Sequence, residues 1–457
     1  MPFVFRSLRA AMPLHVMGLS AFLLLADYAR ADWREEIGLN SLQRRLGGAA
    51  PTGAGIAATQ VEMSEDSAGD YLPDASDAQF AGKTINIRSG ESGSSNHATV
   101  VARYYFGLSS PARSIKRTDI FEANEWSSAI LRVGSSREPL QEPHPVQNHS
   151  WVGSLRDSRM DADALRRLDL LVQRDGVVVA AGVNNGGHTR MPQLMCSAYN
   201  AIAVGLTSAD SSHGPTRAEV SGRVKPDIVA PLDATSWATP VVAASAALLL
   251  ESADELQALQ RLELSQRRPA RALLVKALLM GGATKDEWPD WRRGLTEPCT
   301  DGTVPLDYRY GAGELNLDNS HRILSGGEFE PSPGRLAPLA AWDYDRIQPG
   351  AARQYWLEVP ASRALHRVSI LAAWNRQIHV RAGASLTLVP ELADVDLRLY
   401  RMESAAPASL VDASVSRIDN VEHIFQPALA TGRYVIEVRT DRPVEYCLTW
   451  HVSAAAP

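Results

Sequence analysis

The sequence predicts an α/β domain with a parallel sheet flanked by helices, followed by an antiparallel β-sandwich. Between residues 55 and 326, short uninterrupted apolar runs alternate with helix-length runs. That pattern is typical of parallel strands buried on both faces. A connector rich in Gly, Pro and Ser follows at 325–338, and beyond it apolar and polar residues alternate with the period of two that antiparallel strands show.

Individual segments justify each part of this prediction in chain order. Apolar runs predict strands at 176–182, 201–205 and 227–231, and helices at 163–173, 241–251 and 271–280. In the last part, Val395, Leu397 and Leu399 alternate with Asp396 and Arg398, and "RYVIEV" and "CLTWHV" read as further strands. We therefore predict one domain at 32–326 and a β-sandwich domain at 327–457.

The N-terminus has the pattern of an export signal. Arg6 and Arg9 precede an apolar run from Met12 to Ala26, and Ala29-Arg30-Ala31 has the small residues of a cleavage site. We expect residues 1–31 to be removed and the product to be secreted or periplasmic. A membrane anchor is the alternative interpretation, but the run is short and interrupted by Pro13, His15 and Gly18.

Composition limits the classes of partner and the redox chemistry. The 457 residues carry a formal net charge of -6 with no clustered basic residues, which argues against nucleic-acid binding. The cysteines are Cys196, Cys299 and Cys447, so at most one disulfide can form, and the sequence leaves the pair open. No H-E-x-x-H motif occurs, and no metal or other cofactor is expected to be required.

Three residues together predict a site for nucleophilic catalysis. Ser236 in "ATSWATP" lies at the start of a predicted apolar helix, where free N–H groups stabilise negative charge; an ordinary N-cap is the simpler interpretation for one isolated serine. His97 begins another helical pattern after a Gly/Ser-rich loop, and Glu62 ends an apolar strand upstream of it. A serine needs a base, and that base needs a carboxylate to hold its tautomer. Asp66 and Asp70 are alternative carboxylates.

These residues lie in motifs that resemble the subtilisin-like serine peptidases. The serine motif G-T-S-x-A-x-P of that family is similar to residues 234–240, and "RVKPDIVAP" before it is also typical. The histidine motif H-G-T-H-V-A-G is similar to "HATVVAR" at 97–103. The oxyanion asparagine of an A-A-G-N-x-G setting is matched by "AGVNNG" at 181–186, and the substrate-pairing strand is matched by "NHSWVG" at 148–153.

The resemblance implies a secreted serine endopeptidase acting on proteins or peptides. In that interpretation Ser236 is the nucleophile, His97 the general base, Glu62 the residue that orients it, and Asn184, rather than its neighbour Asn185, the oxyanion donor. Ser150, Trp151 and Gly153 would bind substrate. The product would be a monomer without a membrane anchor; structural calcium is common in the family, but no loop here predicts it.

Departures from the family pattern keep a second function open. Glu62 stands where the family has Asp, and Ala98 and Ala234 replace glycines beside the catalytic His and Ser. These changes favour an alternative in which the chain is a weak or inactive member that binds peptides or partners. The C-terminal region resembles the jelly-roll or pre-peptidase-like β-domains appended to secreted proteases, with either attachment or stabilisation as its role.

Overall fold

The computed structural model describes residues 32–64, 69–155, 157–294, 304–361, 365–381, 386–402 and 408–454. The predicted signal peptide at 1–31, together with Asp66 and Cys299, lies outside these residues. Within them, no helix combines the length and apolar character needed to cross a membrane.

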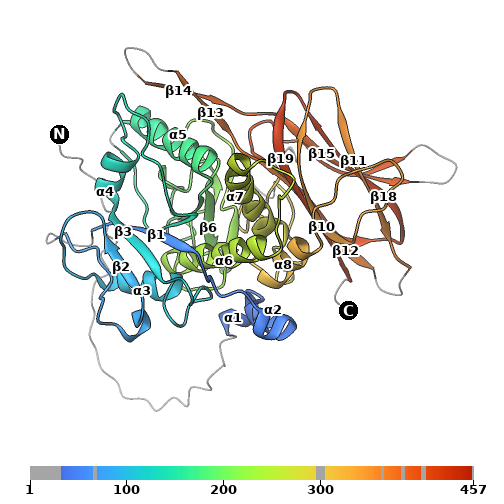
Figure 1. The fold of residues 1–457 in the computed structure, drawn as a ribbon. Coiled ribbons are helices and arrows are strands. Elements are labelled where there is room, and N and C mark those ends of the chain that lie inside the picture. Colours follow the sequence, from blue (N-terminus) through green and yellow to red (C-terminus); the bar gives the residue numbers. More distant parts are fainter. Residues whose placement is uncertain are drawn as a thin grey trace, which may run out of the picture.

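A seven-stranded sheet, parallel throughout, forms the first part of the fold (Figure 1). Its strands, in order across the sheet, are β2 (Thr84–Ile87), β3 (Arg117–Glu122), β1 (Ala57–Glu62), β4 (Val146–His149), β5 (Val178–Gly182), β6 (Ile202–Leu206) and β9 (Ile228–Ala230). The apolar runs expected to be central strands are β5, β6 and β9, and they are buried on both faces. The predicted parallel sheet is therefore confirmed.

Helices cover both faces of this sheet because alternate strand residues point to opposite sides. Val178 and Ala180 belong to a core that includes the buried residues of α6, whereas Val179 and Ala181 pack with the apolar side of α5. The helices and shorter elements of this part are α1 (Trp33–Glu36), α2 (Leu39–Leu46), η1 (Gly47–Ala49), η2 (Ala78–Phe80), α3 (Asn96–Tyr105), α4 (Ala123–Glu125), the π-helical η3 (Trp126–Ile130), α5 (Ser158–Asp175), the β7–β8 hairpin (Gly214–Pro215 and Val224–Lys225), α6 (Thr235–Glu255), α7 (Leu264–Gly281) and α8 (Leu317–Ser325).

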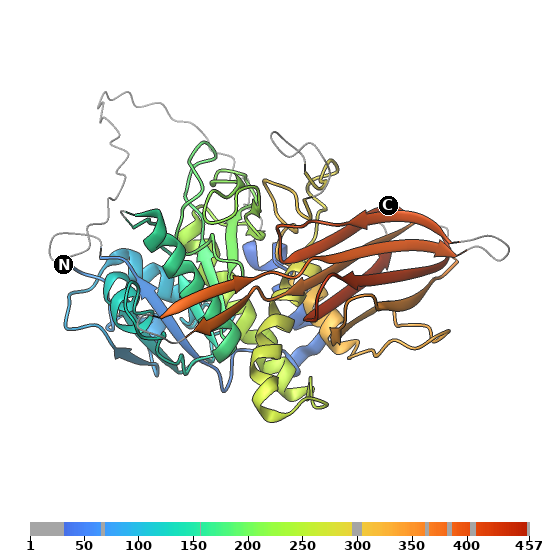
Figure 2. The same cartoon turned by 90° about the horizontal axis from the view of Figure 1, so that it is seen from above.

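The C-terminal region forms two four-stranded antiparallel sheets that enclose an apolar core, as predicted (Figure 2). One sheet has the order β10 (Ala340–Ile347), β19 (Val444–Ala454), β12 (His366–Trp374) and β17 (Val421–Leu429). The other has the order β11 (Ala352–Val359), β18 (Gly432–Thr440), β15 (Val395–Met402) and β16 (Ser409–Ser414). The resemblance to a jelly-roll domain and the boundary at 326 and 327 stay predictions.

The sandwich sheet formed by β10, β19, β12 and β17 packs its outer face on the helices of the α/β part. Trp342, Leu371 and Cys447 from β10, β12 and β19 belong to the same apolar core as α6, α7 and α8. Cys447 and Cys196 are both buried and unpaired, so no disulfide joins these two residues. The sandwich therefore packs on the α/β part through a continuous core.

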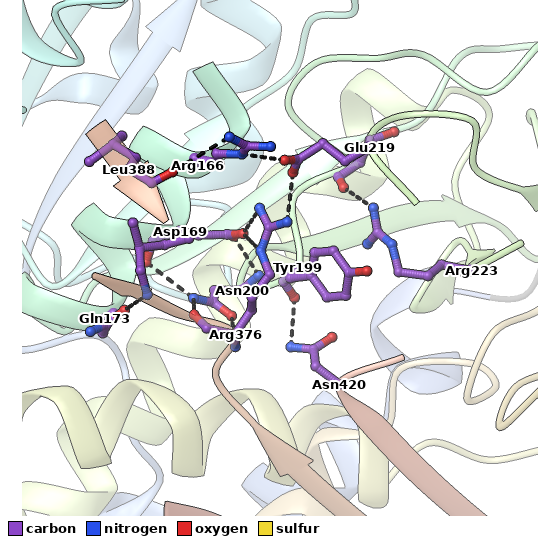
Figure 3. Close-up of polar contacts among 12 residues, drawn as sticks. Arg166, Asp169, Gln173, Tyr199, Asn200, Glu219, Arg223, Arg376, Leu388 and Asn420 are labelled. Carbon is purple, nitrogen blue, oxygen red and sulfur yellow. Dashed lines mark hydrogen bonds and ion pairs between the residues drawn. The ribbon is translucent and has the colours of Figure 1, made fainter. Parts of the chain in front are cut away.

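A hairpin and a buried polar network add a second contact between the two parts (Figure 3). The hairpin β13–β14 (Gln377–Arg381 and Thr387–Glu391) extends over α5, where Ile378 and Leu388 pack on Leu170. Just before it, the guanidinium of Arg376 forms ion pairs of 2.6 Å with both Asp169 of α5 and Glu219 of the β7–β8 loop. All three side chains of this cluster are at most 5% exposed.

Candidate active site

The residues predicted to act together gather at one edge of the parallel sheet. Glu62 is the last residue of β1, Ser150 directly follows β4, and Asn184 lies two residues beyond β5. In a parallel sheet these carboxyl ends lie along a single edge. Helices α3 and α6, which carry His97 and Ser236 near their first residues, pack against each other.

Glu62 and His97 form a direct pair. The distance between Nδ1 of His97 and Oε2 of Glu62 is 2.9 Å, with the carboxylate fully buried and the imidazole 25% exposed. Because Nδ1 donates to the carboxylate, the tautomer with a lone pair on Nε2 is favoured. The extra methylene of glutamate, relative to the family's aspartate, therefore does not prevent the contact.

Gln60, which the sequence analysis did not predict as a site residue, orients the Glu62 carboxylate. Gln60 lies two positions before Glu62 on β1, so its side chain points to the same face. Its amide Nε2 donates to Oε1 of Glu62 at 3.0 Å and to the carbonyl of Ala98 at 3.2 Å. Gln60 thus ties the carboxylate to the helix that carries the imidazole, and only the period-two spacing on the strand could have pointed to it.

The start of α3 is held by its own capping residue. Ser95 is the N-cap, and its hydroxyl accepts a hydrogen bond of 3.0 Å from the backbone N–H of Ala98. Ala98 is fully buried. The alanine that replaces the family glycine beside the histidine is therefore accommodated at the first turn of the helix.

Ser236 is the second residue of α6, a 21-residue helix whose remaining length is almost wholly buried. Ala234 precedes the helix in an extended conformation with φ −145°, which any residue adopts, so its methyl group introduces no backbone strain. Ser236 and Ser150 form two hydrogen bonds with each other. Its hydroxyl donates to the Ser150 carbonyl at 3.5 Å, and the Ser150 hydroxyl donates to the Ser236 carbonyl at 3.1 Å.

The asparagine whose side chain contacts the residue before Ser236 is Asn185, which differs from the sequence-based choice of Asn184. The side-chain oxygen of Asn185 accepts from the Thr235 N–H at 2.9 Å and from the Thr235 hydroxyl at 3.0 Å. Asn184 instead uses its backbone, with its N–H donating to the Ser212 hydroxyl and its carbonyl accepting from the Ser212 N–H. The contacts therefore favour Asn185 over Asn184 as the amide beside Ser236.

The three residues expected to bind substrate differ in their surroundings. Ser150 is buried and contacts Ser236, as described above. Trp151 is 5% exposed and packs in the core beneath the sheet, so its side chain contributes to folding and not to a substrate surface. Gly153 uses its carbonyl to accept from Leu194 N–H at 3.1 Å, so part of the expected pairing edge is already occupied within the chain.

The alternative carboxylate Asp70 has a different role. Its Oδ1 accepts from the backbone N–H of Gly93 at 2.9 Å, which fastens the loop before α3. Among the other histidines, His149 is fully buried against the Trp126 ring, and burial lowers its pKa to about 3. Burial also lowers the pKa of His144. Burial therefore disfavours the protonated form of both imidazoles, which a general base must adopt during catalysis.

Among the described residues, no group of three or more His, Cys, Asp or Glu side chains is placed to hold a metal ion. The arrangement has the elements of nucleophilic catalysis by a serine: a hydroxyl at the start of α6, an imidazole that contacts Trp237, the residue after it, and a carboxylate that orients the imidazole. Fold and site together have the features expected of a serine hydrolase with an α/β architecture.

Comparison with known proteins gives a family match for part of the chain. Residues 113–313 match the model of the subtilase family, peptidase S8. The match contains Ser236 and both asparagines, whereas Glu62 and His97 lie before it. This part of the chain, less than half of its length, is therefore similar to the subtilase family of serine peptidases. No curated protein sequence matches the chain.

Several solved protease structures are similar to this chain. The prenylagaramide maturation protease PagA is 19% identical, covering 62% of this chain and 96% of its own, with a TM-score of 0.38. The PatG macrocyclase in complex with peptide is 15% identical, covering 62% and 97%, with a TM-score of 0.39. Fervidolysin from Fervidobacterium pennivorans, a keratinolytic enzyme, is 12% identical, covering 90% and 75%, with a TM-score of 0.36.

Proposed function

We propose that the protein is a secreted serine endopeptidase that uses Ser236, His97 and Glu62 as its catalytic residues. The observation that carries the proposal is the 2.9 Å contact between a fully buried Glu62 carboxylate and the Nδ1 atom of His97. A buried carboxylate stabilises the imidazolium that forms when the base takes a proton. Export rests on the residue pattern before Asp32.

In this proposal the reaction proceeds through an acyl-enzyme. The Ser236 hydroxyl rotates from Ser150 toward His97, its proton passes to Nε2 of His97, and Oγ attacks the carbonyl carbon of the scissile peptide. The imidazolium then protonates the departing amine as the C–N bond breaks. Water, activated by the same imidazole, hydrolyses the ester and restores Ser236.

The oxyanion would be bound by the backbone N–H of Ser236 and by Nδ2 of Asn185. Two hydrogen bonds from Thr235 hold the Asn185 carbonyl oxygen, so the opposite side of the amide presents its N–H₂ next to the nucleophile. The start of α6 adds the positive end of the helix dipole at the same place. Both effects favour the charge that develops in the transition state.

A fluorophosphonate probe tests the assignment without knowledge of the substrate, because it reacts with an activated serine. We expect wild-type protein to be labelled at Ser236, Ser236→Ala to lose the label, and His97→Ala to react much more slowly. Mass-spectrometric peptide mapping locates the label. Equal labelling of wild type and both variants would refute the site, and a folded but unlabelled wild type would favour the alternative of a peptide-binding protein.

A further inference from the structure

A row of aromatic rings connects the first helix to the imidazole of His97. The ring centroids of Trp33 and Tyr104 lie 5.8 Å apart in an edge-on contact. Tyr104 stacks on Trp237 at 6.2 Å, and Trp237 lies 5.4 Å from His97. The row therefore passes from α1 through α3 to the residue directly after Ser236.

The first ring of this row has a fixed position. The guanidinium of Arg34 lies over the Trp33 ring, 4.3 Å from its centroid, and donates to the carbonyl of Ser109. Following α1, Leu39 and Leu42 of α2 are buried in the main core. Arg45 of α2 pairs with Asp318 of α8 at 2.7 Å.

The same segment is also fastened to the helix that carries the nucleophile. One carboxylate oxygen of Glu251 on α6 accepts from the backbone N–H groups of Thr52 and Gly53 at 2.7 and 2.6 Å. The segment from 32 to 53 is thus joined to α6 at Glu251, near one end of the helix, and through the rings at Trp237, near the other. Its placement relative to Ser236 does not depend on a single contact.

The row of rings restrains a motion of the His97 imidazole that the hydrogen bond to Glu62 does not by itself prevent. A hydrogen bond at Nδ1 fixes one edge of an imidazole, but the ring can still rock about that bond. The Trp237 ring lies beside the imidazole with an angle of 37° between the ring planes and limits that rocking. Tyr104 and Trp33 in turn pack behind Trp237, and all three rings are partly buried against the main core.

We propose that Trp33 is a positioning residue of the active site, acting through Tyr104 and Trp237 to hold the imidazole of His97 in line with Ser236. The inference rests on the proposed function. It makes the first helical turn after the predicted cleavage site part of the catalytic assembly. A displacement of a catalytic group by about 1 Å can reduce a rate by about a hundredfold, so loss of this support is measurable.

The test measures the kinetics of fluorophosphonate labelling over a range of probe concentrations in the full chain. We expect Trp33→Ala to lower the limiting labelling rate by about tenfold or more, with little change in the half-saturating concentration, because the probe's binding surface is not altered. Trp33→Phe retains an aromatic ring against Tyr104 and should recover most of the rate. Thermal unfolding verifies that each variant is folded.

Two further variants complete the experiment. Trp288→Ala removes a tryptophan from a different ring stack, with Tyr310 at 3.9 Å, and should label at the wild-type rate. Trp33→Leu keeps apolar contact with the core and replaces Trp33→Ala if the latter fails to fold. A folded Trp33→Ala or Trp33→Leu protein with the wild-type limiting rate overturns the inference alone. An unlabelled wild type overturns the proposed function and the inference with it.

Discussion

At the scale of single residues, the proposed site uses a glutamate where the subtilisin-like peptidases have an aspartate. The Glu62 carboxylate reaches His97 and is steered by Gln60, so side-chain length and orientation are matched to this strand end. Shortening the side chain to Asp withdraws the carboxylate by roughly 1.5 Å, one bond length. Replacing it by Gln keeps the length and removes the charge.

These two changes should therefore behave differently. We expect Glu62→Gln to reduce kcat by up to about 10⁴-fold, the loss caused by amide replacement of the carboxylate in another serine-protease triad. Glu62→Asp should retain part of the activity, because a charge remains near the imidazole. Steady-state kinetics on a peptide substrate measures both. An active Glu62→Gln enzyme would remove Glu62 from the triad.

The two neighbouring asparagines offer a matched comparison. Asn185→Ala should lower kcat by about 10²- to 10³-fold, a magnitude borrowed from removal of the oxyanion amide in subtilisin. Asn184→Ala should have a much smaller effect, since Asn184 contacts Ser212 through its backbone. The opposite order of kcat values would restore the assignment made from the sequence motif.

At the scale of secondary-structure elements, α6 both presents Ser236 and anchors the N-terminal segment. Because a carboxylate accepts two backbone hydrogen bonds at Glu251, we expect Glu251→Ala to reduce the free energy of unfolding by about 1.5–3 kcal/mol. Glu255→Ala, at an exposed position of the same helix, is the control and should change it by less than about 0.5 kcal/mol. Urea denaturation gives both values; equal values would show that the Glu251 contacts contribute nothing.

The sequence predicted those elements whose signal is local. Strands β5, β6 and β9 and helices α5, α6 and α7 follow from apolar runs, and Ser236, His97 and Glu62 follow from motifs at the ends of such runs. Gln60 was not predicted, and Asn185 was set aside for Asn184, because a difference of one or two positions at a strand end is decided by contacts with distant residues. Trp33 meets Tyr104 only in the folded chain.

At the scale of the whole molecule, the C-terminal sandwich is joined to the α/β part by a buried arginine. Arg376 pairs with Asp169 and Glu219, and removal of one partner leaves buried charges uncompensated. We expect Arg376→Ala to destabilise the protein by about 3–5 kcal/mol. Arg381→Ala, exposed on β13, should have little effect. Chemical denaturation compares them, and similar midpoints would show that the buried pairs do not join the two parts.

Burial between the two parts also predicts a pH dependence of stability. Lys285 is buried beside His423 and the rings of Trp291 and Phe425, and this burial lowers the pKa of its amine to about 7. The unfolded chain binds this proton up to the ordinary lysine range, so it holds more protons than the folded chain above pH 7. Stability should therefore rise with pH from about 7 toward 10, through this group.

Lys285→Met removes that contribution. We expect the variant to be more stable than wild type at pH 7, with the difference shrinking as the pH rises toward 10. Thermal unfolding across this range measures it. A difference that stays constant, or grows with pH, would contradict the assigned direction of the lysine pKa shift.

The central claim is that this molecule hydrolyses peptide bonds with Ser236. The most direct measurement is incubation of purified protein and its Ser236→Ala variant with a denatured protein substrate, followed by mass-spectrometric identification of the new termini. We predict internal cleavage sites with the wild type and none with the variant. A correctly folded wild type that produces no more new termini than Ser236→Ala would contradict the claim.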